Sequence, residues 1–108
     1  MAPEDVVRLL FARVRAGDPS AGDLYASDAF LHTPSGRHDG RDAITDFYRG
    51  VTRGGRTQPE IEALYAAPPL VVALLSVTVG EAEVVRVVDV FEVQDGAIQS
   101  LRVCSFLD

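Results

Sequence analysis

Two strand-like runs joined by an Asp-Gly turn constrain the fold of this chain more than any other feature. The runs cover residues 84–93 and 97–106, and Gln94-Asp95-Gly96 joins them. Asp-Gly between alternating apolar runs is typical of a tight hairpin, because glycine tolerates the positive φ that such a turn requires. The sequence therefore predicts an antiparallel hairpin at this end of the chain.

A single acid interrupts the apolar face of the first run. Alternate residues of a strand share a face, so one side carries Val85, Val87, Asp89, Phe91 and Val93. Arg86 points to the other side and offers Asp89 no partner. A carboxylate taken out of water pairs with a charge, titrates upward or faces a water-filled pocket. We favour a pocket, and the alternative is a buried acid bonded to a tyrosine or to backbone.

The length and the charge of the chain limit its class and its partners. A chain of 108 residues is the size of one domain, so we expect a single domain over residues 1–108. A net charge of −6, with arginine as the only basic residue type, disfavours nucleic acid and anionic membranes as partners. The absence of lysine suggests a GC-rich, bacterial genome. With no signal-like segment and no membrane-spanning run, we expect a cytoplasmic protein.

The cysteine and the histidines indicate neither a disulfide nor a metal site. Cys104 is the only cysteine, and its place in a predicted strand favours a small buried side chain over a nucleophile. His32 and His38 lie six residues apart, with only Asp39 and Asp42 near them. This spacing is not typical of a chelating site, so we expect no metal and no other cofactor.

The rest of the chain reads as helices followed by strands. Apolar spacing of three and four predicts a helix over residues 3–16 and a second one after Gly40-Arg41-Asp42 that stops at Gly54-Gly55. A short helix is expected to open at Asp18-Pro19. Strands are predicted over residues 29–33, 57–66 and 70–79, the last buried on both faces, and His38 is expected to be solvated in a loop. This order predicts an α+β domain with helices on one face of a curved sheet.

Three short motifs accompany this order of elements. They are Leu24-Tyr25-Ala26-Ser27-Asp28-Ala29, then Pro34-Ser35-Gly36 with Gly40-Arg41, and finally Val88-Asp89-Val90-Phe91-Glu92-Val93 with Asp95-Gly96-Ala97-Ile98. Together they resemble the nuclear transport factor 2-like superfamily, and within it SnoaL-like proteins and ketosteroid isomerases. The resemblance implies a cone-shaped, curved, largely antiparallel mixed sheet wrapped around helices, the cystatin-like architecture, with an internal pocket and usually a dimer.

The resemblance also implies roles for particular residues. Asp89 falls on the isomerase acid of the oxyanion hole, and Tyr25 and Tyr48 fall on pocket tyrosines. Leu10 and Thr33 replace the principal oxyanion tyrosine and the general-base aspartate, so standard ketosteroid isomerase activity is not expected, since threonine cannot act as that base. SnoaL-like polyketide cyclases use an aspartate as acid/base in an apolar pocket, and the resemblance implies this role for Asp89. The epoxide hydrolases of the superfamily need a second strand acid, which is missing.

These observations lead to one functional prediction and two alternatives. We predict an apolar pocket for a hydrophobic carbonyl-bearing or polycyclic molecule, with proton transfer of the isomerase or cyclase type and Asp89 as the catalytic acid/base. The predicted ligand-binding residues are Leu10, Tyr25, His32, Thr33, Tyr48, Phe91, Leu101 and Val103. The alternatives are a non-catalytic small-molecule-binding module and a protein-association module of the same fold.

The other face of the first run predicts how the chain assembles. Val84, Val88 and Val90 point away from the pocket, with Arg86 and Glu92 beside them. Exposed β-branched residues in a row form a patch that monomers rarely keep. We therefore expect a homodimer through the outer surface of the sheet. His32 alternates with Thr33, so it faces a helix or the second subunit if Thr33 faces the pocket.

Overall fold

A computed structural model describes residues 1–55, 57–81 and 83–107 of the chain. Two α-helices, α1 (Pro3–Arg15) and α2 (Arg41–Thr52), are each followed by a short 3₁₀ helix, η1 (Pro19–Leu24) and η2 (Arg53–Gly55). The strands are β1 (Tyr25–Thr33), β2 (Gly36–Asp39), β3 (Thr57–Ala67), β4 (Leu70–Val79), β5 (Glu83–Gln94) and β6 (Ala97–Leu107).

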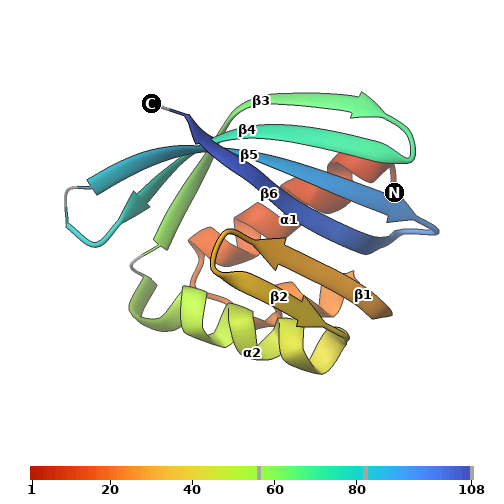
Figure 1. The fold of residues 1–108 in the computed structure, drawn as a ribbon, viewed down its shortest axis with the longest axis horizontal. Helices are drawn as coiled ribbons and strands as arrows, with labels where there is room; N and C mark the ends of the chain where they lie inside the picture. The colour runs from red at the N-terminus through yellow and green to blue at the C-terminus, as the bar shows by residue number, and fades with distance from the viewer. Residues whose placement is uncertain (56, 82, 108) are drawn as a thin grey trace.

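The strands that the structure describes form one six-stranded mixed sheet in the order β2-β1-β6-β5-β4-β3. Neighbouring strands are antiparallel except β1 and β6, which are parallel. The sheet curves over α1, and α2 lies beside β1 and β2 (Figure 1). Both helices therefore cover the inner face, which confirms the predicted α+β class and cone-shaped architecture.

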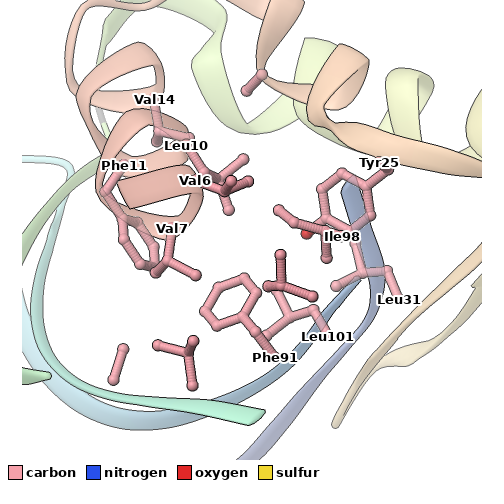
Figure 2. Packing of buried hydrophobic residues seen from close by; sticks show 14 of the residues in the cluster. Val6, Val7, Leu10, Phe11, Val14, Tyr25, Leu31, Phe91, Ile98 and Leu101 are labelled. Atoms are coloured by element: carbon pink, nitrogen blue, oxygen red, sulfur yellow. The ribbon is translucent and has the colours of Figure 1, made fainter. Parts of the chain in front are cut away.

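The core forms where α1 meets the inner face of the sheet. The apolar stripe of α1 is buried throughout: Val6, Val7, Leu10, Phe11 and Val14. Phe11 meets Phe91 of β5 edge to face, with ring centroids 5.8 Å apart (Figure 2). Glu4 and Asp5 in the first turn and the arginines in the last turn match the dipole of the helix. The predicted amphipathic helix is therefore confirmed.

The hairpin that organises the sequence is present in the structure. Asp95 and Gly96 both have positive φ, 54° and 75°, as a tight two-residue turn of this hand requires. On the inner face of β5, Val87, Asp89 and Phe91 are buried. On the outer face, Val84, Val88 and Val90 are exposed or half-buried. The predicted division of β5 into two faces is thus confirmed.

The region around the first strand differs from the prediction. β1 begins at Tyr25, four residues earlier than expected, and β2 occupies the segment that was predicted as a loop. Pairing of Leu31 with His38 puts the histidine on the inner side, where its ring lies 5.0 Å from that of Phe47. His38 is therefore half-buried against Phe47 in a strand, and the loop that was expected to hold it in solvent is absent. The cause is that a short, charged edge strand carries no apolar alternation to reveal it.

Two burial predictions on the sheet were also wrong. β4 is fully buried only on its inner face, at Val71, Ala73 and Leu75, while Val72 is half-buried on the outer face. Both helices lie on the inner face, so no helix covers the outer one. Cys104 is exposed at a β-bulge of β6, because it follows the inner-facing Val103 and no helix covers the outer face. In the described ranges, no helix is long and apolar enough to cross a membrane.

Candidate functional site

A cavity of about 510 Å³ lies between the helices and the inner face of the sheet. Its volume is within the range of small-molecule sites. The apolar lining comes from Phe11, Val14, Leu31, Pro34, Phe47, Val51, Pro59, Leu75, Val77, Val79, Val85, Val87, Leu101 and Val103. The polar lining residues are Thr33, Ser35, Tyr48, Thr57 and Asp89, and within the described chain no arginine or histidine joins them.

Asp89 is the acid of this cavity. Its neighbours on the adjoining strands are Ala73 and Val103, so neither strand offers a hydrogen bond from a side chain. Only 5% of the residue is exposed, and among the described residues its Oδ1 atom has no hydrogen-bond partner. Burial removes water from the carboxylate and raises the pKa of Asp89 to about 7. The group can therefore give or take a proton near neutral pH.

Tyr48 and Tyr25 form a hydrogen-bonded pair beside the acid. Tyr48 projects from α2 and lines the cavity, and its hydroxyl oxygen lies 2.7 Å from that of Tyr25 at the start of β1. Burial raises the pKa of both hydroxyls, and the charge of Asp89 contributes in the same direction. Both tyrosines therefore stay protonated. Either hydroxyl can be the donor of the bond between them. If Tyr25 donates to Tyr48, the hydrogen of the Tyr48 hydroxyl is free to donate to a bound molecule.

Local contacts hold the two tyrosines in place. Thr52 donates from Oγ1 to the carbonyl of Tyr48 at 2.7 Å, one turn along α2. Arg41 donates from Nε to the carbonyl of Tyr25 at 2.9 Å. The ring of Phe47 meets that of Tyr48 edge to face at 5.2 Å. The Arg41 bond joins α2 to β1, and the other two contacts hold Tyr48 within α2.

The structure brings five of the predicted site residues to the cavity: Thr33, Tyr48, Asp89, Leu101 and Val103. Tyr25 is fully buried and reaches it only through Tyr48. The placement of Leu10 and Phe91 in the site was wrong, because both are fully buried and packed in the core under α1. His32 is exposed on the outer face and does not line the cavity. The roles of the lining residues stay predictions.

Several lining residues were not singled out from the sequence. Phe11, Val14, Phe47 and Val51 belong to the apolar stripes of the two helices. A stripe of this kind predicts which side of a helix is buried, but it does not separate packed core from cavity wall. The inner residues of β4 were missed because the strand was expected to be buried on both faces. Its strict alternation of buried and half-buried positions begins at Val71.

The curved mixed sheet and its internal apolar cavity define a nuclear transport factor 2-like protein. Within that superfamily, residues 7–101 match the SnoaL-like domain. The match spans most of the chain, so the protein belongs to the SnoaL-like family. No curated protein matches the sequence.

Solved structures with low sequence identity share this fold. A putative polyketide cyclase from Sinorhizobium meliloti is 20% identical with a TM-score of 0.83, over 93% of this chain and 94% of that one. An NTF2-like protein of unknown function from Cytophaga hutchinsonii is 13% identical with a TM-score of 0.85, over 99% and 91%. A cystatin-fold protein from Novosphingobium aromaticivorans is 17% identical with a TM-score of 0.84, over 100% and 99%.

Proposed function

We propose that this protein catalyses proton transfer on a neutral, largely apolar carbonyl compound bound in the cavity, in an isomerisation or cyclisation. The observation that carries the proposal is the buried Oδ1 atom of Asp89, which has no partner in the described chain and lies at a cavity lined mostly by apolar side chains. Buried polar atoms are normally satisfied, so an orphaned one at a cavity favours a ligand. The neighbouring Tyr48 supplies a hydroxyl donor.

The proposed chemistry needs only these side chains. The Asp89 carboxylate takes a proton from the carbon next to the carbonyl, and the electron pair moves onto the carbonyl oxygen. The Tyr48 hydroxyl donates a hydrogen bond to that oxygen, and Tyr25 donates to Tyr48. Protonated Asp89 then gives the proton to a different carbon of the enolate, which isomerises the compound. Alternatively, the enolate carbon attacks a second carbonyl of the same molecule, and Asp89 gives its proton to the alkoxide oxygen that forms, which completes a cyclisation. These hydrogen bonds stabilise the negative charge that develops on the carbonyl oxygen during the reaction.

The charge of the cavity limits its ligand. In the described lining, Asp89 is the sole residue with a carboxylate, and no basic side chain is available to pair with an anion. A ligand carboxylate would lose its water and meet a second negative charge at neutral pH. We therefore propose that neutral molecules bind and their acidic analogues do not. The volume of about 510 Å³ accommodates a tricyclic or tetracyclic skeleton.

A polycyclic ketone in D₂O tests the proposal without knowledge of the natural substrate. We expect the protein to accelerate exchange of the protons next to the carbonyl, measured by proton NMR, with a rate that rises with pH through about 7 as Asp89 ionises. The matched ketone with a carboxylate on its skeleton should bind at least about 10-fold more weakly by calorimetry at pH 8. Equal affinity would contradict the ligand class.

A non-catalytic binding module is the second candidate. It is favoured by the absence of a second carboxylate from the described lining, and by Thr33 at the position where ketosteroid isomerases have their base. In this case the neutral ketone still binds more tightly than its carboxylate analogue, but the protein does not accelerate exchange of the ketone's protons. The NMR measurement therefore separates the two candidates, while calorimetry tests the cavity that they share.

A further inference from the structure

The internal cavity has a closed end and an open end. Along the inner face of β4, exposure rises from fully buried Ala73 through half-buried Val77 to Val79, which is 43% exposed. Asp89 of β5 is paired in register with Ala73, so the acid lies at the closed end. A ligand whose carbonyl reaches Asp89 therefore extends along the strands toward Val79 and the open end.

A second hollow lies on the surface between α1 and β3, and we call it the α1–β3 groove. It has a volume of about 330 Å³ and is lined by four apolar residues, Phe11, Ala12, Pro59 and Ile61, and by three charged ones. Phe11 and Pro59 also line the internal cavity, and no other residue of the described chain lines both spaces. These two residues therefore form the partition between the groove and the cavity.

Phe11 forms the part of this partition that lies near the acid. Its ring projects from α1 toward the sheet and meets the ring of Phe91 edge to face at 5.8 Å (Figure 2). Phe91 follows Asp89 by two residues on the same face of β5, so Phe11 stands beside the closed end of the cavity. Only 7% of Phe11 is exposed, because the ring fills the space between cavity and groove.

The backbone around the partition is held by bonds between α1 and β3. Arg15 donates from Nη1 to the carbonyl of Pro59 at 2.7 Å, and Gln58 donates from Nε2 to the carbonyl of Arg15 at 3.0 Å. β3 is an edge strand, where a proline is tolerated because no neighbour needs its missing N–H. With the helix fixed on this edge, the side chain at position 11 decides whether the two spaces connect.

We infer that Phe11 determines the specificity of the cavity at its closed end: the ring excludes a bulky substituent next to the ligand carbonyl. The inference rests on the proposed function for the position of that carbonyl at Asp89. A substituent at the far side of the ligand extends toward the open end, whereas one beside the carbonyl meets Phe11. The cavity therefore selects ketones that are unsubstituted next to the carbonyl on the side of α1.

A smaller side chain at position 11 is expected to turn the groove into an extension of the cavity. Ala12 and Ile61 would then offer an apolar surface to a substituent that passes the former partition. Burial of the same apolar area is worth about the same free energy in either direction. The loss of one ring should therefore remove the discrimination between the two positions of the substituent.

Two isomers of one tricyclic ketone test this inference by calorimetry. One isomer carries a butyl group on the carbon next to the carbonyl, and the other carries it at the far end of the skeleton. Wild type should bind the far-end isomer at least about 10-fold more tightly. Phe11→Ala should bind the two isomers within about 3-fold of each other. Phe11→Leu, which keeps more of the core filled, should shift the preference in the same direction.

Phe47→Ala is the matched control, because it makes the same change in a cavity wall on α2 that does not border the groove. It enlarges the cavity without joining it to the groove, so the preference for the far-end isomer should persist. Addition of Ala12→Phe to Phe11→Ala should restore the preference, because the new ring occupies the groove. Circular dichroism melts should show each variant folded.

Three results would overturn the inference. They are a wild-type protein that binds both isomers equally, a preference that is lost in Phe47→Ala as readily as in Phe11→Ala, and a preference that Ala12→Phe does not restore. The proposed function fails by a different result. If wild type shows the isomer preference but does not accelerate proton exchange, Phe11 still determines the specificity of a binding site, and only the catalytic proposal falls.

Discussion

The free energy of unfolding is expected to fall by about 4 kcal/mol between about pH 4 and pH 7 through Asp89 alone. In the unfolded chain this carboxyl ionises near its ordinary pKa of 3.8, whereas burial raises the pKa in the folded protein to about 7. Between these two values the folded state holds a proton that the unfolded state has lost. Stability therefore decreases as pH rises through this window and levels off above it.

The difference in the free energy of unfolding between wild type and Asp89→Asn, taken at each pH, isolates the contribution of Asp89. Asp18 and Glu62 have a lowered pKa because of their hydrogen bonds. They titrate in both proteins, so their contributions to the free energy of unfolding cancel in the difference. Urea unfolding from pH 4 to pH 8 should show a wild-type slope that the asparagine variant lacks. Parallel stability curves for the two proteins would mean that Asp89 is not desolvated, and the proposed function would lose its basis.

Replacement of Asp89 by asparagine is also expected to lower proton exchange from the bound ketone by about 10²–10⁴-fold, the usual contribution of a general acid/base. Asparagine has nearly the same shape but cannot take the proton. The affinity for the neutral ketone should change by no more than about 3-fold, because the apolar walls are untouched. NMR exchange rates and calorimetry on the same samples measure the two quantities separately.

Asp28→Asn is the matched control for this variant, because Asp28 is an exposed aspartate of β1 that does not line the cavity. It should exchange protons at the wild-type rate. Retained activity in Asp89→Asn would remove Asp89 from the mechanism. Loss of ketone affinity together with loss of exchange would instead show that Asp89 holds the ligand.

Much of this fold could be predicted from the sequence because the signals were local. The Asp95-Gly96 turn and the alternation through β5 fixed the hairpin and the two faces of the strand. The position of Asp89 on the inner face followed from that alternation alone. The apolar stripe of α1 likewise placed the helix against the sheet. These features depend on neighbours within a few residues along the chain.

The remaining errors concern features that depend on distant parts of the chain. Leu10 and Phe91 share a face with cavity residues, but the position of α1 against the sheet buries them in packed core. β2 exists because β1 offers it an edge, and its own sequence is polar. Cys104 is exposed because both helices cover the other face of β6, which the strand's own sequence does not reveal. None of these can be obtained from periodicity.

Titration of the Asp89 carboxyl carbon by ¹³C NMR tests the central claim most directly. The signal can be assigned by its absence from the spectrum of Asp89→Asn in protein labelled at aspartate. We expect a midpoint near pH 7, since burial against apolar strands raises the pKa of this group. A midpoint near the ordinary value of 3.8 would show a solvated carboxylate and would contradict a desolvated acid/base in the cavity.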